Sequence, residues 1–148
     1  MGLFDQVFNA PQNQAATLST AEAFAAICLV AIAADGYLSE QENTEMRLLL
    51  SRMKLFSDYS SERLERTKDQ LLNRLKQHGP GVLIEAAKSV LPRDLAPTAF
   101  AIATDLVLAD GTVTVQEQAF LDDLYRILEI PADQALKIVE VITLKNQG

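Results

Sequence analysis

Two short segments of this 148-residue sequence carry an aspartate, a glycine and a glutamate at the same spacing. The first motif, residues 34–42, reads Ala-Asp-Gly-Tyr-Leu-Ser-Glu-Gln-Glu, and the second motif, residues 109–117, reads Ala-Asp-Gly-Thr-Val-Thr-Val-Gln-Glu. Carboxylates bind hard divalent cations, and paired carboxylates can act as a general acid and base. The candidate metal ligands in the two motifs are Asp35, Glu42, Asp110 and Glu117.

The spacing reproduces the second half of a calcium-binding EF-hand loop, including its invariant glycine and its final glutamate. The earlier acidic positions of such a loop are occupied here by Ala31 and Ala33 in the first copy and by leucines in the second. None of these side chains can bind a hard cation, so the motif is not an EF-hand. A weaker cation site shared between the copies stays open, with Asp105 as an extra ligand because it interrupts an apolar run.

Each motif also has a purely structural explanation. The glycine ends one helix, the following serine or threonine caps the next, and Glu42 or Glu117 completes a capping box. Asp35 and Asp110 are not explained in this way, because a carboxylate near a helix C-terminus is disfavoured by the helix dipole. Three compensating partners are possible for them: a backbone N–H of the turn, a basic side chain, or a metal ion.

The elements that position these motifs are predicted to be helices throughout. Apolar residues recur at helical spacing along the chain, and no alternating run is long enough for a central strand. We expect helices from Ser19 to about Asp35, from Ser39 to about residues 55–59, from Ser61 to Gly79, over 82–90, from Asp94 to Asp110, from Thr114 onward and from Pro131 onward. This pattern predicts an all-α, compact bundle of seven helices, with the helix-turn-helix units related by an internal pseudo-twofold.

An N-terminal arm is expected over residues 1–13, before a single domain over residues 14–148. Its apolar residues Leu3, Phe4, Val7 and Phe8 fall on one side of a short helix. We favour folding of this arm onto the domain; docking to a membrane or a partner is the alternative. The sequence shows no secretory signal and no stretch long enough to cross a bilayer, so we expect a cytoplasmic protein.

Composition excludes several functional classes. Thirteen basic and twenty acidic residues give a net charge of −7, which argues against nucleic acid as a partner. The single cysteine, Cys28, and the single histidine, His78, exclude a disulfide framework and a Cys/His zinc site. Cys28 is predicted to be a buried, inert thiol and His78 to lie at a helix C-terminus. With no phosphate-binding loop or nucleophile motif, we do not expect an enzyme.

At its two motifs the sequence resembles the TerB-like family, which is associated with bacterial tellurite resistance. The resemblance rests on the paired Ala-Asp-Gly-x-apolar-x-x-x-Glu elements and extends over residues 21–142. It implies an all-α fold built around the motifs, a cytoplasmic stress-response role, and metal chelation by the acidic motif residues. We therefore expect a non-enzymatic interaction module with an acidic surface and a protein partner or self-association. A divalent-cation-binding protein is the alternative.

Overall fold

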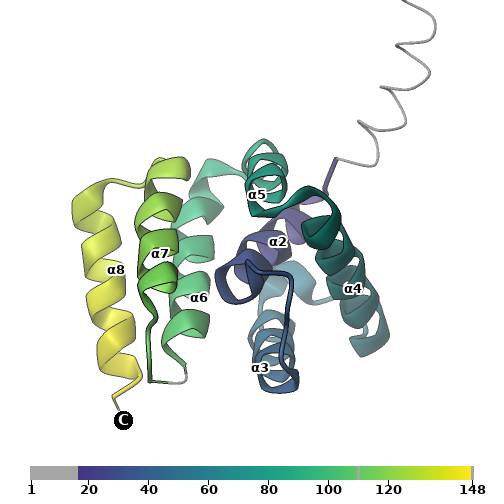
Figure 1. The fold of residues 1–148 in the computed structure, drawn as a ribbon, viewed down its shortest axis with the longest axis horizontal. Helices are drawn as coiled ribbons and strands as arrows, with labels where there is room; N and C mark the ends of the chain where they lie inside the picture. The colour runs from purple at the N-terminus through teal and green to yellow at the C-terminus, as the bar shows by residue number, and fades with distance from the viewer. Residues whose placement is uncertain (1–16, 110, 148) are drawn as a thin grey trace, which may run out of the picture.

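The computed structural model describes residues 17–109 and 111–147, which form seven α-helices and no strands (Figure 1). The helices are α2 (Thr20–Ala33), α3 (Glu40–Ser51), α4 (Ser61–His78), α5 (Pro80–Lys88), α6 (Ala96–Leu108), α7 (Val115–Ile127) and α8 (Ala132–Lys145). Two short 3-10 helices, η1 (Lys54–Phe56) and η2 (Arg93–Leu95), connect α3 to α4 and α5 to α6. The predicted all-α bundle is confirmed. The predicted N-terminal arm, with Leu3, Phe4, Val7 and Phe8, lies outside the described residues.

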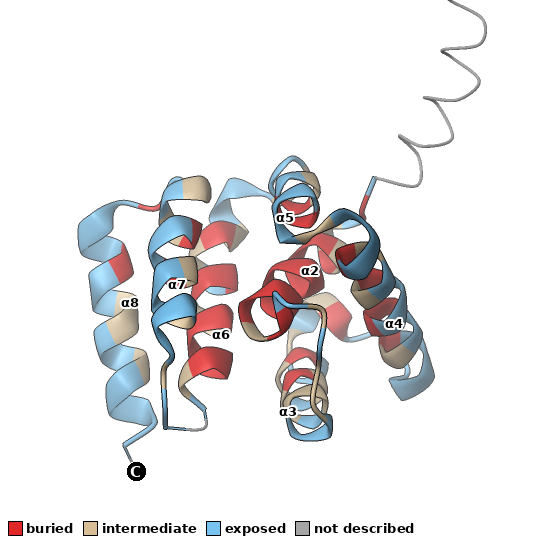
Figure 2. Cartoon of the chain, viewed as in Figure 1, coloured by how far each residue is buried: buried red, intermediate tan, exposed pale blue. Residues whose placement is uncertain are grey.

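Helix α2 is the centre of the fold and packs against α3, α4, α5, α6 and α7. The spacing of Phe24, Ile27, Cys28, Ala31 and Ile32 predicts one apolar face on this helix, but the buried surface extends beyond that face. Leu29 and Val30, on other sides of the helix, are also fully buried. Figure 2 shows most of the α2 ribbon in the colour of buried residues. A helix that is apolar on all sides is stable only inside the protein, and the many alanines of α2 let its neighbours approach closely. The surrounding helices therefore hold α2 in place, and with it the start of the turn that follows.

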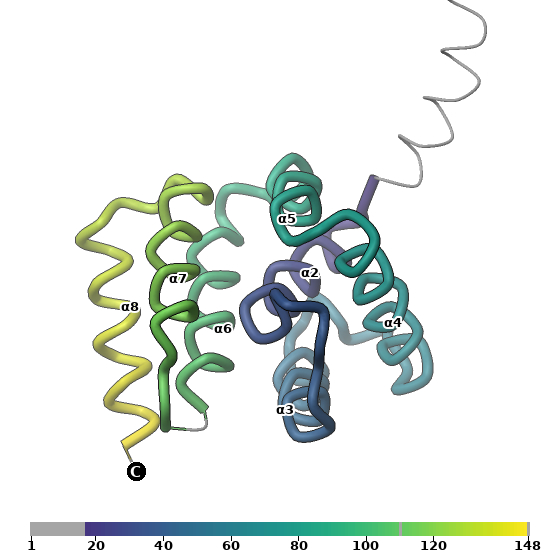
Figure 3. Tube along the Cα trace, viewed as in Figure 1, coloured from purple at the N-terminus to yellow at the C-terminus, as the bar shows by residue number. Residues whose placement is uncertain are grey.

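Helices α6, α7 and α8 stand side by side at one end of the molecule (Figure 3). Helical spacing places Phe100, Ala103, Leu106 and Val107 on one face of α6, and all four residues are buried. Helix α8 is less buried, with only Ala135 fully enclosed and Val141 and Leu144 exposed to solvent. No helix in the described ranges is long and apolar enough to cross a membrane.

Several helix ends differ from the sequence prediction. Helix α3 ends at Ser51, and the predicted continuation is the 3-10 turn that buries Phe56 edge-on against Phe24. Helix α5 begins at Pro80, earlier than expected, because Gly79 adopts a φ of +85° that reverses the chain directly before it. Proline has its φ already fixed near the helical value, so it starts the new helix at little cost.

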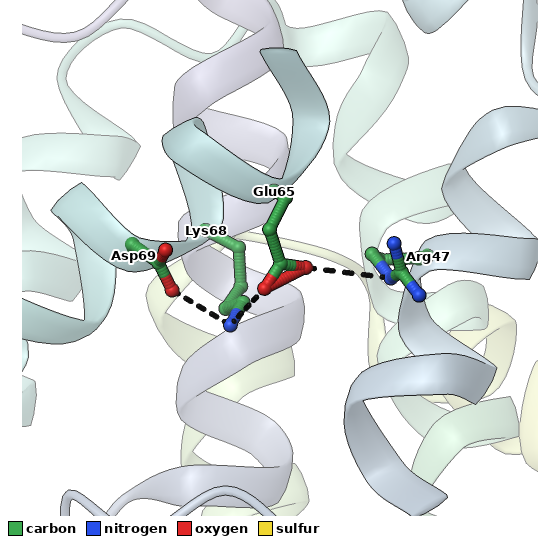
Figure 4. Close-up of polar contacts among 4 residues, drawn as sticks. All are labelled: Arg47, Glu65, Lys68 and Asp69. Carbon is green, nitrogen blue, oxygen red and sulfur yellow. Dashed lines mark hydrogen bonds and ion pairs between the residues drawn. The ribbon is translucent and has the colours of Figure 1, made fainter. Parts of the chain in front are cut away.

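A polar network joins α3 to α4, at the end of the molecule opposite α8 (Figures 1 and 4). Lys68 is buried, and its Nζ lies 2.7 Å from Glu65 Oε2 and 2.7 Å from Asp69 Oδ1. Arg47 Nε of α3 lies 3.5 Å from Glu65 Oε1. A buried ammonium group is tolerated only when it is paired, so the carboxylates are what allow a lysine on the apolar face of α4.

This network predicts a pH-dependent contribution to stability. Burial lowers the pKa of Lys68, but hydrogen bonds to Asp69 and Glu65 outweigh burial and raise the pKa above its ordinary value of 10.5. The stabilisation is therefore fully present below the ordinary pKa and is lost as the pH rises through the folded-state pKa. Urea unfolding from about pH 8 to pH 12 should show the wild type losing more stability than Lys68→Met. Parallel stability curves for the two proteins would contradict this prediction.

Candidate functional site

The first motif forms the turn between α2 and α3. Gly36 adopts a φ of +87°, and its N–H donates to the carbonyl of Ala33 at 2.8 Å. The Ser39 hydroxyl accepts from the Glu42 N–H at 3.1 Å, and Glu42 Oε1 accepts from the Ser39 N–H at 3.0 Å. The predicted capping box is confirmed. It fixes where α3 begins and therefore where its acidic first turns project.

Asp35 finds its compensating partner within the same turn. Its Oδ1 accepts from the backbone N–H of Tyr37 at 3.0 Å, and the side chain remains exposed. Of the three kinds of partner left open by the sequence, the backbone N–H is therefore present. An aspartate in this position stabilises the turn by bonding two residues ahead, as in an Asx turn.

The second motif forms the turn between α6 and α7. Gly111 adopts a φ of +80°, and its N–H donates to the carbonyl of Leu108 at 3.0 Å. The Thr114 hydroxyl accepts from the Glu117 N–H at 3.0 Å, and Glu117 Oε1 accepts from the Thr114 N–H at 2.9 Å. This capping box is confirmed as well. Asp110 lies outside the described residues, so its predicted role as a ligand stays a prediction.

The two motifs meet at a pair of adjoining hollows of about 320 and 460 Å³, which we call the motif groove. Both hollows are lined by Ile32 and Asp35 from the first helix-turn-helix unit and by Glu117 from the second. The first hollow adds Tyr37, Ser39, Gln41, Glu42, Glu45, Leu106 and Val107, and the second adds Val30, Ala31, Ala34, Thr114, Gln116 and Phe120. Carboxylates far apart in the sequence thus surround one depression.

Among the groove residues that the sequence did not single out are Glu45 and Tyr37. Glu45 is one helical turn beyond Glu42 in α3, and its carboxylate joins the same lining. Tyr37 occupies the variable position after the glycine, and its ring is exposed to solvent beside the hollow. The spacing of Glu42 and Glu45 was a usable signal, because residues three apart share a helix face. Nothing in the sequence marked Tyr37.

The remaining predicted ligand, Asp105, lies elsewhere. It is buried on α6, where its Oδ1 accepts from Lys145 Nζ at 3.2 Å and from Asn146 Nδ2 at 3.0 Å. These partners come from the C-terminal end of α8, and Asp105 does not line the motif groove. Among the described residues no group of three or more histidine, cysteine or acidic side chains is arranged to hold a metal ion.

The two other singled-out residues are placed as the sequence indicated. Cys28 is fully buried in α2, and burial raises the pKa of its thiol far above the ordinary value. A thiol that stays protonated is a poor nucleophile and a poor metal ligand. His78 is the last residue of α4, where a cationic side chain suits the helix dipole.

The fold and the groove together define a class of protein: an all-α domain in which two glycine turns are each followed by a capping box, and both capping boxes contribute residues to one acidic depression. A family model described as "Tellurite resistance protein TerB" matches residues 21–139, which is most of the chain. The chain belongs to the TerB family. No curated protein and no solved structure matches it. The family match ends within α8, so the partners of Asp105 lie beyond it.

Replacing each turn glycine by alanine tests how much the stability of the protein depends on the positive φ at that position. A Cβ at position 36 would meet a φ of +87° and would lie 3.3 Å from Cγ of Lys76, so Gly36→Ala is expected to cost about 1–2 kcal/mol. Gly111→Ala meets the same φ region in open space and is expected to cost about 1 kcal/mol. Gly81→Ala, with an open site inside α5, is the control and should gain up to about 1 kcal/mol. If denaturant unfolding showed that Gly36→Ala is as stable as Gly81→Ala, the result would contradict this order.

Proposed function

We propose that this TerB-family protein is a non-enzymatic interaction module of a cytoplasmic, tellurite-associated stress response, and that it binds a protein partner through the motif groove. The observation that carries the proposal is the position of Asp35, Glu42, Glu45 and Glu117 around one depression between two helix-turn-helix units. Three of these carboxylates, those of Asp35, Glu42 and Glu117, also accept hydrogen bonds from backbone N–H groups in their own turns or helix caps. The groove therefore keeps a fixed shape, which favours specific binding because little ordering entropy is lost.

The test is capture of the partner by matched variants. Tagged wild-type protein is recovered from extracts of cells that produce it, grown with and without tellurite, in parallel with Asp35→Asn plus Glu45→Gln. Asparagine retains the oxygen that accepts from the Tyr37 N–H, and Glu45 belongs to no capping box, so the fold should persist. A partner enriched by the wild type and lost with the variant supports the proposal. Recovery of no partner, together with normal growth of a deletion strain under tellurite, contradicts it.

A second candidate function is divalent-cation binding at the same turns. It is favoured by Asp35 and Glu117, one carboxylate from each motif, which line both hollows, and the sequence adds Asp110 as a candidate ligand. Calorimetric titration with calcium, magnesium, manganese and zinc at millimolar concentration tests it. The control is Asp35→Asn plus Asp110→Asn, which removes one charge from each motif. Heat that is absent from the wild type, or that is equal in both proteins, eliminates this candidate.

A further inference from the structure

The motif groove offers apolar surface as well as acid. Ile32 and Phe120 are only partly buried, and both line the depression. The exposed ring of Tyr37 lies at the edge of the first hollow. Hollows of about 320 and 460 Å³ are large enough to take an apolar side chain, and burying a leucine-sized group gains about 1.5–3 kcal/mol. The groove can therefore contribute hydrophobic binding energy.

The acidic side chains that line the groove form no ion pair with another described residue of the lining, and Lys76 of α4, whose Cγ lies beside Gly36, is a cationic side chain next to the first turn. Glu42 and Glu117 each use one oxygen to accept from a backbone N–H, and Asp35 does the same in its turn. Glu45 Oε1 accepts from the amide of Gln41 at 3.4 Å. These donors are all neutral, so the bonds leave the negative charges in place. Among the described residues that line the groove there is no lysine, arginine or histidine.

We propose that the motif groove receives a segment of another protein in which a large apolar side chain is flanked by lysine or arginine. The proposal rests on the proposed function, that a protein partner binds here, and specifies the chemistry of that partner. The apolar side chain would enter beside Ile32 and Phe120, and the flanking cations would meet the carboxylates of Asp35 and Glu45. Complementary charge of this kind accelerates association and selects against wrong partners.

Charge also argues against the two occupants that this chain could supply itself. Residues 1–16 include the apolar Leu3, Phe4, Val7 and Phe8, but they contain an aspartate and no lysine or arginine. A second copy of the protein brings a net charge of −7 to a groove that is already negative. Like charges disfavour both complexes, because each would bury acid against acid. A cationic segment from a different protein is the complementary occupant.

The test uses three short synthetic peptides with a fluorescent label. The first places leucines between lysines, the second replaces the leucines by serine, and the third replaces the lysines by glutamate. Fluorescence anisotropy should show binding of the first peptide, with affinity about tenfold weaker for the serine peptide. The glutamate peptide should not bind. Added sodium chloride should weaken binding, because it screens the attraction between the groove carboxylates and the peptide lysines.

Matched variants locate the binding site. Asp35→Asn plus Glu45→Gln should weaken binding of the leucine-lysine peptide by about fivefold or more. The control, Glu85→Gln plus Asp123→Asn, removes the same charge at exposed positions that do not line the groove and should change affinity by less than about twofold. Equal weakening by the two variants would show that only net charge matters and would overturn the proposal. Equal affinity for the leucine and serine peptides would overturn it too.

Two further results separate this inference from its alternatives. Calcium or magnesium that releases the peptide far more effectively than sodium chloride of equal ionic strength would make the groove a cation site and would overturn the inference. A partner that the wild type captures through the groove, in the absence of binding by any cationic peptide, would overturn the inference and leave the proposed function standing. Failure of capture itself counts against the proposed function.

Discussion

Phe24→Ala is expected to lower the free energy of unfolding by about 3–5 kcal/mol. Phe24 is fully buried in α2 and contacts the ring of Phe56 edge-on, with the ring centroids 6.4 Å apart. Truncation removes a large apolar group and leaves a cavity that the surrounding helices cannot close, since α2 is packed on all sides. Because the first motif directly follows α2, and Ile32 of α2 lines the groove, the substitution should also weaken the packing that supports the groove.

Denaturant titration of wild type and Phe24→Ala measures this loss directly. Val141→Ala is the matched control, because Val141 is exposed on α8 and its truncation should change stability by no more than about 0.5 kcal/mol. A loss for Phe24→Ala below about 1 kcal/mol would mean that α2 is not the packed centre of the fold. A loss for Val141→Ala as large as that for Phe24→Ala would mean that the outer face of α8 is covered in solution.

Local features of this protein could be predicted from its sequence because their causes are local. The capping boxes of the two motifs join residues three apart, so Ser39 and Glu42 or Thr114 and Glu117 determine the start of a helix without help from the rest of the chain. The positive φ of Gly36 also has a local cause, because glycine adopts this conformation without the steric cost of a Cβ. The fold class and most helix starts were therefore predictable.

Tertiary arrangement could not be predicted in this way. The all-round burial of α2 depends on how many helices pack against it, although its uninterrupted apolar stretch was a usable signal. The meeting of Asp35 and Glu117 depends on the packing of α2 against α6 and α7. Asp105 accepts a hydrogen bond from Lys145, forty residues further along the chain, and no sequence pattern connects positions that far apart. The periodicity of the sequence cannot predict contacts between side chains that only long-range packing brings together.

The placement of Asp105 leads to the second large expected effect. Lys145→Ala plus Asn146→Ala removes both donors to a buried carboxylate and is expected to cost about 2–3 kcal/mol, because the remaining charge keeps its desolvation penalty. Adding Asp105→Leu removes that charge and should recover most of the lost stability. Recovery is expected because the penalty belongs to the unpaired carboxylate rather than to the missing donors. Denaturant unfolding of the double and triple variants measures both steps.

The same pair of variants distinguishes a carboxylate that anchors α8 from one that binds a cation. If Asp105 anchors the end of α8, the double variant loses stability equally with and without added divalent cation. If Asp105 is a metal ligand, removal of Lys145 and Asn146 frees its oxygen, and millimolar calcium or magnesium should restore stability to the double variant but not to the triple variant. We expect no such restoration, because Asp105 does not line the motif groove and is buried against α8. Restoration by the cation would contradict the anchoring role and support the candidate metal site.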